Sequence, residues 1–313
     1  MENLMLSVNA VMPMFLVIAA GYLARYLGIL SRADVPKFNK VAFRVFIPCL
    51  LFHNIYSSDL SQAIRPRLML FAVAGVLFVF TCAILAVRRF EPIPDRKGVV
   101  AQGIFRSNFV IMGLPIAEAL VGPDNLGPVS VLIAVVVPLF NLLAVITLES
   151  FRGSKPNPGH MLLQIITNPF VAGSLLGILF LLLKIKLPYF ISHAVQNLGS
   201  IGTPLQLFLL GAFFRFDGLK RYKKELTVLT AVKLVITPAI MLTLAILLGF
   251  RGVEFVALIG IFASPTAVNS FTMAQQMEAG DAELAGDIVM STSAFCIPTF
   301  FLWIWLFKSL GIF

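Results

Sequence analysis

Two apolar segments of the sequence each combine a proline with an asparagine at short spacing. Asn108 precedes Pro115 by seven residues, and Asn269 follows Pro265 by four. A proline lacks the backbone N–H and clashes with the preceding turn, so we expect a helix built from either segment to open there. The open turns leave backbone N–H and C=O groups unpaired, and the amide side chains can hydrogen-bond a ligand as donors or acceptors. This pattern is typical of a site that binds a small polar molecule reversibly.

We expect the openings at residues 113–115 and 264–266. The half-helix after each opening begins with unpaired N–H groups, which favour an anion. The half-helix before it ends with unpaired carbonyls, which favour a cation or a protonated donor. A small carboxylate can therefore be held here without a dedicated buried arginine. The alternative is that both prolines only kink packed helices, as many helix prolines do.

Basic and polar residues lie close to the two openings. Arg106 can draw an anion towards the site, or it can extend its guanidinium to the membrane interface, as we also expect of Arg44 and Lys233. An asparagine at this depth can bind the ligand or can bridge two packed helices. The predicted ligand-binding residues are Arg106, Asn108, Gly113, Pro115, Gln206, Ser264, Pro265, Thr266 and Asn269, with Asn141 and Asn197 as weaker candidates.

Few residues of the apolar segments can exchange a proton or hold a coupling ion. Glu118 follows the first opening, where the half-helix dipole can equally serve only to stabilise its charge. His53 can relay a proton or can be a polar residue of the membrane interface. Asp287 lies at the start of the last apolar segment. We take Glu118, His53 and Asp287 as the candidate coupling residues.

The sequence contains no enzyme motif. It has no HExxH, GxSxG or Walker sequence, and no histidine and cysteine cluster at metal-ligand spacing. Its three cysteines lie in apolar segments without CxxC spacing, which is typical of small core residues. The sequence therefore predicts neither an enzyme nor a bound metal or cofactor.

The apolar composition identifies the elements that position these residues. Of the 313 residues, 59% are hydrophobic, and the mean hydropathy is +0.94, far above that of a soluble domain. About twenty apolar residues cross a bilayer as a helix, so we predict an all-α integral membrane protein with ten transmembrane helices. The predicted spans are residues 6–25, 38–56, 68–88, 98–121, 127–149, 161–183, 190–213, 226–249, 253–277 and 284–307.

Basic residues are distributed unevenly between the connections. The odd-numbered connections hold 15 Arg and Lys, and the even-numbered ones hold 5. Because cytoplasmic loops carry such an excess, the odd connections are predicted to be cytoplasmic, and both termini are predicted on the outer side of the inner (plasma) membrane. The net charge of +9 then reports membrane topology, and no nucleic-acid partner is expected.

The two halves of the sequence repeat. Pro13 and Pro169, and likewise Pro48 and Pro204, are 156 residues apart. Because each half holds five predicted spans, the halves face opposite ways across the bilayer, as an inverted repeat of five plus five helices. The fourth and ninth spans carry the two openings and occupy equivalent places. We therefore expect these broken helices to cross near the bilayer midplane.

The repeat also sets the domain boundaries. Residues 1–151 form the first predicted five-helix repeat and residues 161–313 the second. Between them, residues 152–160 form a polar linker rich in proline and glycine, which is typical of a loop and is predicted to be cytoplasmic.

The first broken segment resembles the signature of a known family. The sequence NFVIMGLP at residues 108–115, followed by Ala119 and Gly122, resembles the auxin efflux carriers, which include the plant PIN-formed exporters and bacterial malonate- and malate-type permeases. Residues 264–274 and 281–298 are similar to that family's other signature. In place of the long cytoplasmic loop of the plant members this sequence has a short polar stretch near Gly153, which is typical of a prokaryotic member.

The resemblance implies a scaffold domain from spans 1, 2, 6 and 7 and a transporter domain from spans 3–5 and 8–10. It implies a homodimer through the scaffold domains and an elevator-like motion. Carried over to this sequence, the site positions would be Asn108, Pro115, Pro265 and Asn269.

The function expected from these observations is secondary active or facilitated transport of small organic anions, malonate-, malate- or auxin-like carboxylates, by alternating access. H⁺ or Na⁺ is the expected coupling ion if the process is active. Two alternatives stay open. One is a sodium-coupled symporter of the bile-acid type, and the other is a membrane receptor or scaffold that does not transport.

Overall fold

The computed structural model describes residues 2–58, 65–122, 125–152, 158–215 and 221–313. Within this part of the chain every regular element is a helix, and one isolated bridge, between Ser107 and Thr266, has β geometry. The prediction of an all-helical protein is confirmed. Most of the predicted linker at residues 152–160, including Gly153, lies outside the described residues.

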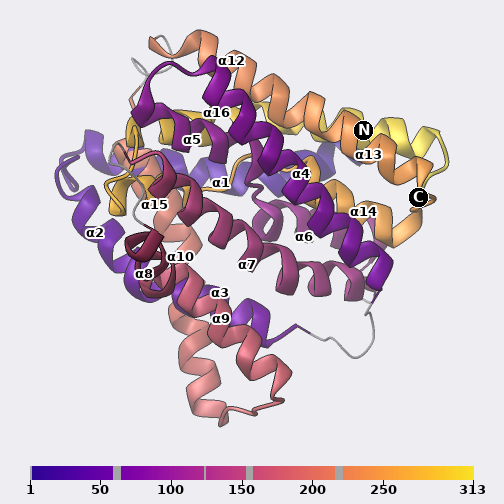
Figure 1. The fold of residues 1–313 in the computed structure, drawn as a ribbon, viewed down its shortest axis with the longest axis horizontal. Coiled ribbons are helices and arrows are strands. Elements are labelled where there is room, and N and C mark those ends of the chain that lie inside the picture. Colours follow the sequence, from indigo (N-terminus) through magenta and orange to yellow (C-terminus); the bar gives the residue numbers. More distant parts are fainter. Residues whose placement is uncertain (1, 59–64, 123–124, 153–157, 216–220) are drawn as a thin grey trace.

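The helices follow one another along the chain as Figure 1 shows. The first half contains α1 (Glu2–Tyr26), α2 (Val35–Val41), η1 (Ala42–Phe46), α3 (Ile47–Tyr56), α4 (Pro66–Phe90), α5 (Pro94–Phe105), η2 (Phe109–Gly113), α6 (Leu114–Val121) and α7 (Gly127–Ser150). The second half contains α8 (Pro158–Thr167), α9 (Pro169–Leu182), α10 (Tyr189–Phe213), α12 (Lys223–Ala231), η4 (Val232–Ile236), α13 (Thr237–Leu247), α14 (Gly252–Phe262), α15 (Asn269–Gln276) and α16 (Ala282–Ser309).

Several of these helices are long and apolar enough to cross a membrane. Large apolar side chains are exposed on their outer faces, among them Leu16, Leu182 and Leu247, and such exposure is favourable where the surroundings are lipid. The candidate spans by length and composition are Pro66–Phe90, Gly127–Ser150, Lys223–Leu247 and Ala282–Ser309, and the shorter apolar helices are Met12–Tyr26, Phe109–Val121, Pro169–Leu182 and Gly252–Phe262.

The chain stays helical through Pro115, so the prediction that the first broken helix opens at residues 113–115 is wrong. A π-helical turn, η2, precedes this proline, and the Leu114 N–H bonds to the carbonyl of Phe109, five residues back. The wider turn accommodates the proline without opening the helix. A π-helical turn also precedes two other prolines. The turn η1 ends two residues before Pro48, and η4 ends two residues before Pro238.

The first opening lies instead at residues 106–108. Helix α5 ends at Phe105, and Arg106 has extended backbone angles (φ −82°, ψ 120°). The second opening, residues 263–268 between α14 and α15, contains Pro265 and the predicted position at residues 264–266. We call these two non-helical segments, 106–108 and 263–268, the crossover.

Glycines allow close helix packing at positions related by the sequence repeat. A side chain on Gly21 of α1 would collide with the backbone carbonyl of Phe208 in α10, and one on Gly177 of α9 would lie 3.0 Å from the carbonyl oxygen of Phe52 in α3. Gly177 follows Gly21 by 156 residues, and Phe208 follows Phe52 by the same number. The two close contacts are therefore equivalents under the offset found in the sequence.

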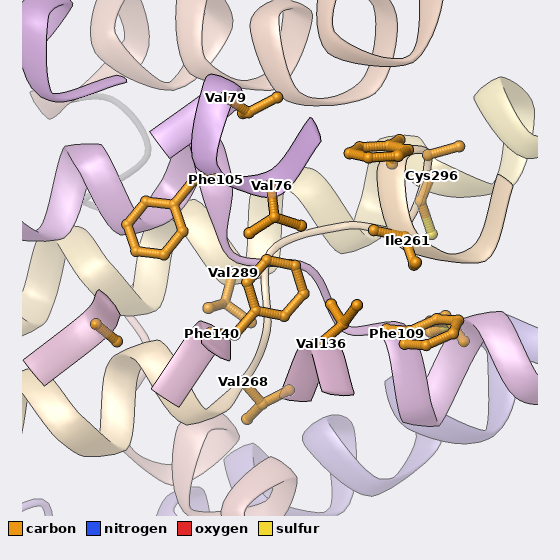
Figure 2. Packing of buried hydrophobic residues seen from close by; sticks show 14 of the residues in the cluster. Val76, Val79, Phe105, Phe109, Val136, Phe140, Ile261, Val268, Val289 and Cys296 are labelled. Carbon is orange, nitrogen blue, oxygen red and sulfur yellow. The ribbon is translucent and has the colours of Figure 1, made fainter. Parts of the chain in front are cut away.

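The hydrophobic core surrounds the crossover. Figure 2 shows buried side chains from several helices gathered around the extended backbone, including Val76 of α4, Val136 of α7 and Val289 of α16. Phe105 and Phe109, which stand directly before and after residues 106–108, are both buried. The crossover is thus held in a tightly packed apolar environment.

Candidate functional site

The two non-helical segments of the crossover pair with each other. Ser107 and Thr266 form an antiparallel bridge, and the backbone N–H of Asn108 donates to the Pro265 carbonyl at 2.8 Å. A helix opened within a membrane must satisfy its free backbone groups inside the protein, and here each opened segment satisfies the other. This mutual pairing explains why the first opening lies opposite Pro265 and not at Pro115.

Thr266 ties the crossover to its neighbours. Its hydroxyl donates to the Gly103 carbonyl of α5 at 2.8 Å, and its backbone N–H donates to the Thr292 hydroxyl of α16 at 3.2 Å. Thr266 is fully buried. Its side chain therefore helps to fix the geometry of the crossover, and a role in ligand binding stays a prediction.

Arg106 is buried at the end of α5, with 2% of its surface exposed. Its Nη2 donates to Asn141 Oδ1 at 2.7 Å, and its Nη1 donates to Gln102 Oε1 at 3.1 Å and lies 2.8 Å from Met273 Sδ. The guanidinium carbon lies 5.9 Å from the ring centre of Phe170. Arg106 is not among the ion pairs of the described residues, so its charge is held by neutral groups.

Lys233 places a second buried cation at the crossover. It lies on η4, is 1% exposed, and its Nζ donates to the Ser107 hydroxyl at 2.6 Å. Among the described residues no carboxylate forms an ion pair with it. The expectation that Lys233 extends to the membrane interface is therefore wrong, and of the two alternatives for Arg106 its burial excludes the interfacial one. Arg44 is exposed.

Depth in the helix was the signal that could have identified Lys233. Helix α12 begins at Lys223, so Lys233 lies about 15 Å along the axis, close to half the thickness of the hydrocarbon core. Lys233 therefore lies well inside this helix and away from its charged end.

Two unpaired donors accompany the cations. The amide nitrogens of Asn108 and Gln102 are buried, and neither has a hydrogen-bond partner among the described residues. Buried polar groups are normally satisfied, so each of these two donors can still bind an acceptor that is not part of the chain, such as a water or a ligand. Cationic and amide donors together fit an oxyanion.

Other predicted ligand-binding residues have structural roles. The Ser264 hydroxyl donates to the Gly260 carbonyl of α14 at 2.5 Å. A Cβ on Gly113 would lie 2.9 Å from the Cα of Gly260, so Gly113 allows η2 to approach α14. Asn269 begins α15 and is half-buried next to the crossover.

Gln206 belongs to a separate polar network, which we call the α2–α10–α15 network. Its Nε2 donates to the Thr272 hydroxyl at 2.8 Å, and that hydroxyl lies 3.2 Å from Asn39 Oδ1. Asn39 in turn donates to Gln275 Oε1 at 2.6 Å. The network joins α10 and α2 to α15, the helix that follows the crossover.

The candidate coupling residues are placed differently. Glu118 is exposed on α6, and His53 is half-buried on α3, with its Nδ1 3.5 Å from the Ser57 hydroxyl. Asp287 is 2% exposed on α16, and its Oδ2 has no hydrogen-bond partner among the described residues. Asp287 precedes Thr292, which bonds to the crossover, by five residues on the same helix. Within the described part of the chain no three His, Cys, Asp or Glu residues form a metal-binding group.

Comparison with known proteins shows the family of this chain. A family model described as membrane transport protein matches residues 6–158 and 155–304. An uncharacterized transporter of Methanothermobacter thermautotrophicus is 23% identical over 301 residues, which cover 95% of this chain and 97% of the relative. The uncharacterized transporter MJ1031 of Methanocaldococcus jannaschii is 22% identical over 314 residues, covering 96% and 99%.

Proposed function

We propose that this chain, which belongs to the membrane transport protein family of auxin efflux carriers, moves small organic anions such as mono- and dicarboxylates across the membrane. One observation carries the choice of an anion. Arg106 and Lys233 are both buried at the crossover without a carboxylate partner among the described residues. Burying a cation at membrane depth is costly, and a bound anion would offset that cost.

The carboxylate of the substrate would accept hydrogen bonds from donors that lack a partner or that make fewer hydrogen bonds than they can. These are the Asn108 amide and the Lys233 ammonium, which has three donors and makes one hydrogen bond within the described chain. The Gln102 amide is a third. Arg106 would contribute mainly charge, because its guanidinium is already held by Asn141 and Gln102.

The proposed transport cycle is alternating access of the elevator type on a repeat of five plus five helices. Spans 1, 2, 6 and 7 would form a scaffold and dimerise, and spans 3–5 and 8–10 would carry the crossover and the anion. The contacts related by 156 residues, between α1 and α10 and between α3 and α9, support such a repeat. The sequence has no ATP motif, so transport would be facilitated or driven by H⁺ or Na⁺, with Asp287 as the most buried of the three candidate coupling residues.

Uptake of radiolabelled malonate and malate into proteoliposomes tests this proposal. Wild-type protein should transport at least one of these dicarboxylates, and Asn108→Ala should lose about tenfold or more in kcat/KM, as removal of a hydrogen bond to a charged group does. The matched control is Asn125→Ala, which removes an exposed asparagine outside the crossover and should leave transport unchanged.

The same assay separates the alternatives. Strict sodium dependence of uptake would favour a sodium-coupled symporter of the bile-acid type. Saturable binding of the anion without uptake or counterflow would contradict transport and favour a receptor.

A further inference from the structure

A groove lies on the surface between α4 and the α12–α13 region, and none of the crossover residues lines it. Its volume is about 890 Å³, and its walls come from α4 on one side and from α12, η4 and α13 on the other, with Val100 and Ile104 contributed by α5. Most of its lining is apolar, and Phe78, Val228 and Ile240 in this lining are exposed. In a bundle of membrane-spanning helices, an exposed apolar groove opens towards lipid.

The groove is about as long as one leaflet of the bilayer is thick. Along α4 its lining runs from Phe78 to Phe90, which is a rise of about 18 Å in an α-helix. One leaflet contributes about 15 Å of hydrocarbon. Beyond Phe90 the lining becomes polar, with Glu91 and Arg96, so this end reaches the interface between membrane and water. The dimensions fit an extended acyl chain.

The interfacial end of the groove is basic. Residues 88–97 and 221–225 contain seven Arg and Lys against three Asp and Glu. Arg96 is already paired, with its Nη1 3.3 Å from Glu225 Oε1. Lys224 lines the groove, is exposed, and has no ion pair among the described residues. Its ammonium is therefore available to an anion at the interface.

We propose that this groove binds one anionic glycerophospholipid from the leaflet on the basic side of the membrane. One acyl chain lies along α4 towards Phe78, and the headgroup phosphate lies at Lys224. A lipid with zwitterionic phosphocholine carries no net charge to match the basic rim, whereas phosphatidylglycerol carries one negative charge. The selectivity arises because each cation near a membrane surface attracts anionic lipid. This site is independent of the anion site at the crossover.

Native mass spectrometry of the full chain in uncharged detergent tests the proposal, with phosphatidylglycerol and phosphatidylcholine of identical acyl chains as probes. We expect one tightly bound phosphatidylglycerol per chain. Lys224→Gln should weaken it about fivefold, as loss of one cation near the surface does, and should leave the weaker phosphatidylcholine binding unchanged. The matched control is Lys186→Gln, which removes an exposed lysine that does not line this groove.

A second pair of variants tests the apolar part of the groove. Cys82 is exposed and lines the groove, so Cys82→Trp should fill it and remove the tightly bound lipid. Thr81 is exposed on the same helix but does not line the groove, so Thr81→Trp should keep the lipid. Circular dichroism of each variant monitors folding. Equal affinity for the two lipids, or equal lipid binding by the two tryptophan variants, would overturn the proposal.

Discussion

Lys233 and Ser107 join two parts of the chain that are 126 residues apart, through a hydrogen bond of 2.6 Å from the lysine Nζ to the serine hydroxyl. The lysine is 1% exposed, and the serine is the residue that bridges to Thr266. A cation is therefore fixed against the extended backbone of the crossover. A buried cation held by a neutral hydroxyl is an unfavourable arrangement unless an anion joins it, and this expectation can be measured.

Replacing Lys233 by methionine should reduce transport without reducing the stability of the protein. Methionine keeps an unbranched side chain of similar length but removes the charge and the hydrogen bond. We expect kcat/KM for the transported anion to fall by about ten- to a hundredfold, as loss of a hydrogen bond to a charged group predicts. The thermal unfolding midpoint without substrate should not fall, because a desolvated cation is removed.

The control for this prediction is Lys186→Met, which changes an exposed lysine and should alter neither quantity. A variant at Lys233 with normal transport would contradict the anion site. A variant that lost transport only because its unfolding midpoint collapsed would assign Lys233 a structural role.

Replacement of Arg106 by lysine should destabilise the protein. The planar guanidinium reaches Asn141 with one nitrogen and Gln102 with the other, at 2.7 and 3.1 Å, and a single ammonium cannot reproduce this fork. Arg106→Lys should therefore leave a buried amide oxygen unpaired and reduce the free energy of unfolding by about 1–3 kcal/mol. Thermal and chemical unfolding in detergent would measure the change. Arg44→Lys, at an exposed position, should stay within about 0.5 kcal/mol of wild type.

Gly113 should behave as a packing residue. Its ideal Cβ would lie 2.6 Å from the Phe109 ring and 2.9 Å from the Cα of Gly260, so Gly113→Ala would push η2 away from α14. We expect a loss of about 1–3 kcal/mol in the free energy of unfolding, as overpacking typically costs. Gly98→Ala is a milder control, because its nearest neighbour, a Leu148 methyl carbon, is 3.3 Å away. A Gly113→Ala variant as stable as wild type would restore the idea that residue 113 is an open, flexible joint.

Local sequence patterns predicted the all-helical fold but not the position of the first opening. A run of about twenty apolar residues specifies a membrane-length helix by itself, and four helices have the length and composition of such a span, whereas the predicted span 161–183 is divided between α8 and α9. Pro115 is a helix breaker by residue type, but the π turn at residues 109–113 absorbs it. The opening is decided by the bond from the Asn108 N–H to the Pro265 carbonyl, a contact between residues 157 positions apart that no local pattern encodes.

Only part of the candidate site was predicted, because its contacts also join residues that are far apart in the sequence. The hydroxyls of Thr266 and Ser264 bond to the carbonyls of Gly103 and Gly260, which their position beside Pro265 did not predict, and their role as ligand-binding residues stays a prediction. Lys233 was assigned to the membrane interface because lysines near helix ends extend towards water, yet it is buried and donates to the Ser107 hydroxyl. Asn108 and Asn269 as ligand-binding residues stay predictions.

Tyr222 lies outside the membrane-spanning helices, and the titration of its phenol group with pH can be measured. Burial, together with the hydrogen bond of 2.9 Å that its hydroxyl donates to Asp281, raises the pKa of Tyr222 above its ordinary value near 10. Because the folded chain holds the phenol proton more tightly than the unfolded chain, this stabilisation is complete below pH 10 and is lost as the pH rises through the raised pKa. Phenolate absorbance, as the difference between wild type and Tyr222→Phe, should show titration above pH 10. Asp281→Asn should lower that pKa, and an unchanged titration curve would refute the assignment.

The α2–α10–α15 network should limit the rate of transport. Asn39 donates to Gln275 at 2.6 Å, and Thr272 bonds to both Asn39 and Gln206. Under the proposed mechanism, α2 and α10 belong to the scaffold and α15 to the moving domain, so these bonds must break in each cycle. Conformational steps of this kind often set kcat. Asn39→Ala should therefore raise kcat several-fold with little change in KM, and a double-mutant cycle with Gln275→Ala should show coupling in kcat, since the two side chains share one bond. A change confined to KM would instead place Asn39 in the substrate site, and purely additive effects on kcat would show that the bond does not resist the motion.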